Sequence, residues 1–87
     1  MSNRYMSKDI TKTLLLINAI GSRQCKYFKI KRLGIKGYTH SELATVVPYM
    51  KSLGLIRHMF NSHCFTYERL FDRNSTEEIM ENLITAG

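Results

Sequence analysis

A helical spacing of apolar residues that ends at a glycine is the feature that most constrains the fold of this chain. Leu43, Val47 and Met50 follow the i, i+4, i+7 pattern of a helix with one buried face. Gly54 follows at the point where a left-handed residue commonly ends a helix. We therefore expect a helix over residues 40–53, with Gly54 as its C-cap and its apolar face, continued by Leu53 or Gly54, against the core.

Prolines, glycines and short polar runs predict the other elements. Pro48 should kink the helix over 40–53, unless its first turn starts late, because proline removes a backbone hydrogen bond. Residues 1–7 are polar and are expected to be disordered. The remaining elements, in chain order, are a helix from about Lys8 to Ile20 capped by Ser7, a turn at residues 34–37, strands at Leu55–Phe60 and Cys64–Phe71 around a turn at residues 61–63, and a helix over 75–85 with Ser75 and Glu78 at capping-box spacing.

Residues 24–33 fit two structures. In a strand, Phe28 and Ile30 would lie on one face and the lysines between and after them on the other. In a helix, Cys25 would meet Phe28 at the i, i+3 spacing. We favour the short helix, and the strand remains the alternative.

The predicted order is three helices, a two-stranded hairpin and a last helix, which resembles the winged helix-turn-helix class of DNA-binding domains. The closest stretch is residues 43–57. In it, apolar residues stand eleven, seven, four and one positions before a glycine, and Leu-Ile and a basic residue follow. The resemblance implies an α+β fold, a winged helix-turn-helix with a three-helix core, a two-stranded hairpin wing and a C-terminal helix. A single domain would then span residues 1–87.

Basic residues gather between residues 22 and 57, where eight lysines and arginines accompany a single acid, Glu42. The net charge of the chain is +6, which favours phosphate-rich partners. Neutralising a phosphate releases its counterions and makes binding depend on salt. We expect double-stranded DNA as the partner; the alternative is a solvated face that keeps the protein soluble. The candidate phosphate contacts are Arg23, Lys26, Lys29, Lys31, Arg32 and Lys36.

The resemblance also assigns roles to the helix over 40–53 and to the hairpin. In this class the helix enters the major groove, and the wing touches the DNA backbone or the minor groove. The recognition face has no arginine, although arginine and lysine make the commonest specific contact with guanine. The candidate contacts on the helix are His40, Ser41, Thr45 and Tyr49. The candidate wing contacts are Arg57, His58, Asn61, Ser62, His63 and Arg69.

The residue pattern does not indicate an enzyme or a metal site. His58, His63 and Cys64 lack the short spacing of zinc ligands, and adjacent residues do not easily share a tetrahedral site. The chain has no glycine-rich phosphate loop and no nucleophile elbow. We therefore expect no catalysis, no cofactor and no metal.

Signals of the cellular compartment favour the cytoplasm. Residues 1–8 lack the apolar run of a signal peptide, and residues 14–20 are too short to span a bilayer. Cys25 and Cys64 are expected to be free thiols, with a single disulfide as the alternative. We expect a cytoplasmic, nucleoid-associated protein without a membrane partner.

The last predicted helix carries an apolar stripe that either folds back on the domain or pairs with a second copy of the chain. An operator with two half-sites requires a dimer, and this favours a homodimer. The candidate dimerisation residues are Ile79, Met80, Leu83 and Ile84.

Three functional hypotheses follow. The first is a small DNA-binding regulator of transcription, prokaryotic or viral, that acts by occupying a promoter. The second is a protein-interaction module on the same fold, such as a phage-encoded inhibitor of a host protein, which would dock through Pro48 and Tyr49. The third is a single-stranded nucleic-acid binder that stacks bases on Phe65 and Tyr67.

Overall fold

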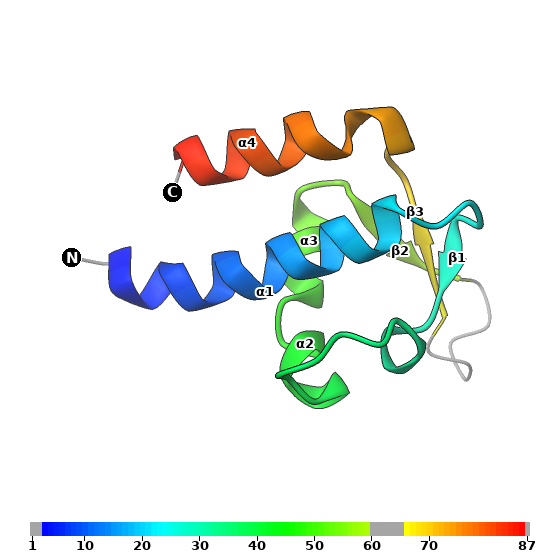
Figure 1. The fold of residues 1–87 in the computed structure, drawn as a ribbon, viewed down its shortest axis with the longest axis horizontal. Helices are drawn as coiled ribbons and strands as arrows, with labels where there is room; N and C mark the ends of the chain where they lie inside the picture. Colours follow the sequence, from blue (N-terminus) through cyan, green and yellow to red (C-terminus); the bar gives the residue numbers. More distant parts are fainter. Residues whose placement is uncertain (1–2, 60–65, 87) are drawn as a thin grey trace.

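Helices and short strands form a small α+β fold (Figure 1). The computed structural model describes residues 3–59 and 66–86. The elements, in chain order, are α1 (Asn3–Gly21), β1 (Tyr27–Phe28), the 3-10 helix η1 (Ile30–Arg32), α2 (His40–Ala44), α3 (Val47–Ser52), β2 (Ile56–His58), β3 (Tyr67–Arg69), the 3-10 helix η3 (Arg73–Ser75) and α4 (Thr76–Ala86).

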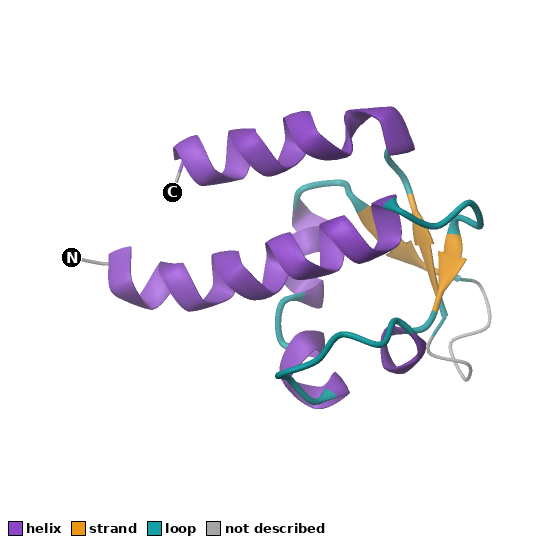
Figure 2. Cartoon of the chain, in the orientation of Figure 1, coloured by secondary structure: helices purple, strands orange, loops and turns teal. Residues whose placement is uncertain are grey.

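The three strands form one antiparallel sheet in the order β1-β3-β2, so that β3 is central. Tyr67 of β3 pairs with Phe28 on one side and with His58 on the other, and Glu68 pairs with Tyr27 and Arg57. The helices lie to one side of the strands (Figure 2). The expected hairpin is therefore present as β2 and β3, with shorter strands than predicted, and a third strand is added to it. The predicted turn at residues 61–63 lies outside the described residues.

The core lies between α1, the α2–α3 pair and the sheet. Ile17 of α1 and Met50 of α3 are completely buried. The predicted face of the segment over 40–53 is correct for Leu43, Val47 and Met50, whereas Leu53 is exposed. The buried hydrophobic residues are Leu16, Ile17, Ile20, Phe28, Ile30, Leu43, Val46, Val47, Met50, Leu55, Ile56 and Tyr67.

The first helix is longer than predicted. It begins at Asn3 rather than near Lys8, so Ser7 lies inside the helix and is not its N-cap. Residues 3–7 are thus helical rather than disordered, since they form the first turns of α1.

The predicted helix over 40–53 is two short helices. Thr39 caps α2 with a reciprocal capping box: its hydroxyl accepts from the Glu42 N–H, and its own N–H donates to the Glu42 carboxylate at 2.8 Å. The helix is interrupted at Val46, the N-cap of α3, and Pro48 lies in the first turn of α3. Proline is tolerated there because the first N–H groups of a helix have no partner within the helix. Leu53 is the C-cap, and Gly54 follows it with φ +76°.

Residues 24–33 form a short strand followed by one 3-10 turn, so the favoured helix is wrong for most of this segment. Phe28 and Ile30 are both buried, as in the strand alternative, but Ile30 lies in η1 and not in the strand. The predicted turn at residues 34–37 is confirmed, with Gly34 at φ +70° and Gly37 at φ +96°.

The C-terminal helix packs antiparallel against α1 (Figure 1). It begins at Thr76, directly after η3. The N-cap is Asp72, at the start of η3, rather than Ser75, which was predicted to cap the helix together with Glu78. Three of the four candidate dimerisation residues pack against the core of their own chain, and only Ile84 is exposed, to 59%. The stripe therefore folds back on the domain, which leaves one of its four residues for a second subunit. The three that pack on the core are Ile79, Met80 and Leu83.

Candidate nucleic-acid interface

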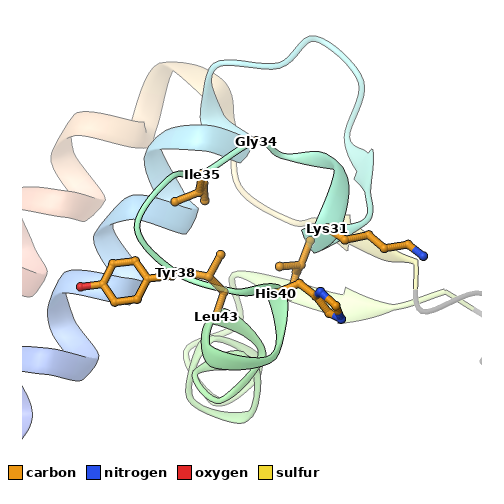
Figure 3. A pocket seen from close by; sticks show the side chains of 7 residues that line it. Lys31, Gly34, Ile35, Tyr38, His40 and Leu43 are labelled. Atoms are coloured by element: carbon orange, nitrogen blue, oxygen red, sulfur yellow. The ribbon is translucent and has the colours of Figure 1, made fainter.

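A pocket of about 110 Å³ lies where η1, the glycine turn and α2 meet. Lys31 and His40 extend their side chains to the same side of this pocket, and Tyr38 points to the opposite side (Figure 3). The pocket therefore joins one predicted phosphate contact with one predicted recognition residue. Its lining residues are Ile30, Lys31, Gly34, Ile35, Tyr38, His40 and Leu43.

The four predicted recognition residues are divided between two helices. His40 and Ser41 are exposed in the first turn of α2. Thr45 is exposed at the end of α2, where its hydroxyl donates to the Glu42 carbonyl at 2.6 Å and lies 3.5 Å from Nζ of Lys12. Tyr49 is half-buried on α3. The single recognition helix is therefore not formed, and two of its four predicted contacts, His40 and Ser41, are exposed together at the start of α2.

The predicted phosphate contacts come from three segments. Lys31 and Arg32 are exposed on η1, and Lys36 is exposed in the glycine turn beside it. Lys29 is half-buried. The other two, Arg23 and Lys26, are exposed in the connection between α1 and β1. Of the six predicted phosphate contacts, Lys31, Arg32 and Lys36 are therefore the nearest to α2 in the sequence.

Glu68 holds two of the predicted contacts together. Its carboxylate accepts from Nε of Arg57 at 2.7 Å and lies 3.2 Å from Nζ of Lys26. The hydrogen bond from Arg57 and, to a lesser extent, the one from Lys26 lower the pKa of the Glu68 carboxyl. The hydrogen bond to Glu68 raises the pKa of the Lys26 ammonium group. Sequence reasoning missed Glu68. Its position in a strand was visible, but its two partners depend on the strand register.

The other side of the sheet is occupied by aromatic packing. Tyr67 is only 7% exposed and stacks on Phe28, with ring centroids 5.6 Å apart, and burial raises the pKa of its hydroxyl. The predicted stacking of bases on Tyr67 is therefore wrong, because the ring is inside the core. The other residue of that hypothesis, Phe65, lies outside the described residues.

Two of the predicted wing residues have other partners. The ring of His58 lies against Tyr67, at 4.7 Å between centroids, and its Nδ1 is 3.1 Å from Nζ of Lys51. Arg69 is buried and donates to the Phe71 carbonyl at 2.6 Å, so it is not a surface contact. Nε of Arg69 has no hydrogen-bond partner among the described residues. The predicted wing residues Asn61, Ser62 and His63 lie outside the described part of the chain.

The described residues contain neither a metal-binding cluster nor a membrane-spanning helix. Within residues 3–59 and 66–86, no group of three or more histidine, cysteine or acidic side chains is placed to hold a metal ion. In the same residues, no helix has the length and apolar character needed to cross a membrane. Cys25 is an exposed free thiol, and Cys64 lies outside the described residues.

No protein-family model, curated protein or solved structure matches the chain. Its fold is that of a small α+β domain with a three-stranded antiparallel sheet, and the chain has a net charge of +6.

Proposed function

We propose that the chain is a winged helix-turn-helix protein that binds double-stranded DNA through η1 and the start of α2, and that regulates transcription by occupying a promoter. The observation that carries this proposal is the shared pocket of Lys31 and His40. One residue of the basic segment and one predicted recognition residue line this same pocket. Such a protein would work on the nucleoid.

The order of elements supports the same class. The pair α2 and α3 leads directly into β2 and then β3, as a recognition helix leads into a wing. In this arrangement α2 presents His40 and Ser41 to the DNA, and the strands β2 and β3 flank it.

The surface favours contacts with the DNA backbone over reading of bases. Lys31 and Arg32 are exposed cations that can neutralise phosphates. The exposed start of α2 offers an imidazole and a hydroxyl, which can contact either phosphates or base edges. Because this surface lacks an arginine at the helix, we expect modest discrimination between DNA sequences.

Binding to a random-sequence duplex, measured by fluorescence anisotropy across a salt series, tests the proposal. Lys31→Gln should weaken binding for all duplexes alike and reduce the slope of log affinity against log salt by about 1. Arg73→Gln on η3 is the matched control, since it removes the same charge near the end of α1, where Arg73 Nε lies 3.4 Å from the Gly21 carbonyl. It should change binding less than Lys31→Gln does.

Two results would contradict the proposal. Absence of duplex binding at low salt would replace DNA with an acidic protein as the partner of the basic surface. Equal effects of Lys31→Gln and Arg73→Gln would mean that net charge, rather than the surface of η1 and α2, governs binding.

A further inference from the structure

Three side chains stand in a row across the sheet on the face turned away from the core. Tyr27, Glu68 and Arg57 are register partners on the three strands, so their side chains share one face. The neighbouring row of Phe28 and Tyr67 points to the buried side. No helix of the described residues covers the outer face (Figure 1).

Glu68 lies beneath two cations that remain largely in solvent. Glu68 as a whole is only 7% exposed, whereas the side chains of Lys26 and Arg57 are 52% and 66% exposed. Nζ of Lys26 also lies 5.5 Å from the centre of the Tyr27 ring. The acid is therefore enclosed by its partners, and the cations present their outer sides to anything that approaches the sheet.

The donors that Glu68 uses are those that bind a phosphate. Guanidinium and ammonium groups pair with carboxylate and phosphate oxygens through the same charge-assisted bonds. The cation of each pair is more than half exposed, so an incoming phosphodiester can reach both Lys26 and Arg57 and take over charge-assisted bonds that they now give to Glu68. One acid between two cations also reduces the local charge that a phosphate meets.

We propose that this outer face of the sheet is a second phosphodiester-binding site, and that Glu68 competes with DNA for Lys26 and Arg57. The inference rests on the proposed function. Lys26 and Lys31 are separated by five residues, which span at most about 17 Å of extended chain. That distance corresponds to about five base pairs of duplex, so the two lysines are no further apart along the chain than a short stretch of DNA.

The test compares Glu68→Gln with Glu81→Gln, which removes the same charge from an exposed position on α4. Both are titrated with random-sequence duplex across a salt series. Glu68→Gln should bind about fivefold more tightly than Glu81→Gln, the equivalent of the released ion pairs. Its salt slope should be steeper by about 1, as for one further phosphate contact.

A second pair of variants assigns this gain to the two cations. Replacing both Lys26 and Arg57 by glutamine should abolish the gain in the Glu68→Gln background. The same double replacement should weaken binding less when Glu68 is present, because Glu68 already occupies both cations. Equal losses in the two backgrounds would overturn the proposal.

The unchanged chain provides a measurement that does not depend on the folding of a variant. The Arg57 Nε–H resonance should move when duplex is added, since its bond to Glu68 is replaced. A resonance that stays in place at saturating duplex, or a folded Glu68→Gln that binds as Glu81→Gln does, overturns the competition alone. If the wild-type chain and all variants fail to bind duplex, the proposed function is wrong and this inference fails with it.

Discussion

At the scale of single residues, Glu68 is the position where the sheet and the surface charge are coupled. It is the only acid among the strand residues of β1, β2 and β3, and it stands on the central strand. Both of its partners were predicted to contact DNA, and the structure gives them an internal partner instead. One acidic side chain of the central strand therefore pairs with both a cation beside β1 and a cation on β2.

Glu68 should make the stability of the fold depend on pH on the acid side. Its pKa lies below the ordinary value of 4.5 in the folded protein. A lowered pKa adds stability that is complete above the unfolded-state value and is lost as the pH falls through the folded-state value. The free energy of unfolding should therefore fall more steeply below about pH 4.5 in the wild type than in Glu68→Gln, as measured by urea denaturation. Parallel pH curves for the two proteins would contradict this role.

At the scale of elements, short-range chemistry explains where the helices begin and end. The capping box of Thr39 and Glu42 starts α2, and Pro48 lies in the first turn of α3 rather than kinking a longer helix. The periodicity of residues 40–53 predicted the buried face but not the break, because both short helices keep the same apolar spacing. Strand β1 has only two residues, so no alternation within it could reveal it.

The contact between α1 and α4 should be sensitive to any side chain at Gly21. A Cβ at this position would overlap with Oγ1 of Thr76 and lie 2.7 Å from its Cγ2. Gly21→Ala should lower the free energy of unfolding by about 1–3 kcal/mol, because overpacking outweighs the better helix propensity of alanine. Urea denaturation measures the change.

A double-mutant cycle provides the control for this prediction. Thr76→Ala removes both of the closest atoms, so Gly21→Ala should be less destabilising in that background. Additive effects of the two substitutions would show that the cost of Gly21→Ala arises elsewhere.

At the scale of the whole molecule, α4 completes the core rather than extending from it. Leu83 packs against the core cluster, while the neighbouring Ile84 is exposed. Leu83→Ala should lower the free energy of unfolding by about 1–2 kcal/mol, less than for a fully buried leucine. Ile84→Ala is the matched control and should change it by less than about 0.5 kcal/mol.

Protein concentration distinguishes this arrangement from a dimer held by the same stripe. If Leu83 packs within its own chain, the effect of Leu83→Ala should be the same at low and high protein concentration. A midpoint of unfolding that rises with concentration and is lost in Leu83→Ala would instead indicate pairing of two chains through α4.

Local sequence determined which faces are apolar and where several elements turn. Leu43, Val47 and Met50 were predicted to be buried because helical periodicity acts over a few residues. Glycines at 34, 37 and 54 have positive φ because a residue without Cβ enters that conformation freely. These features depend only on neighbouring residues, so the sequence by itself determines them.

Only the tertiary structure decided which charges remain available at the surface. Glu68 meets Lys26, which precedes β1, and Arg57, which lies on β2, at separations of 42 and 11 residues along the chain. The register of a strand is set by the packing of its buried face, here Tyr67 against Phe28. No local pattern contains that register, and a shift of one residue would turn Glu68 toward the core and break both ion pairs.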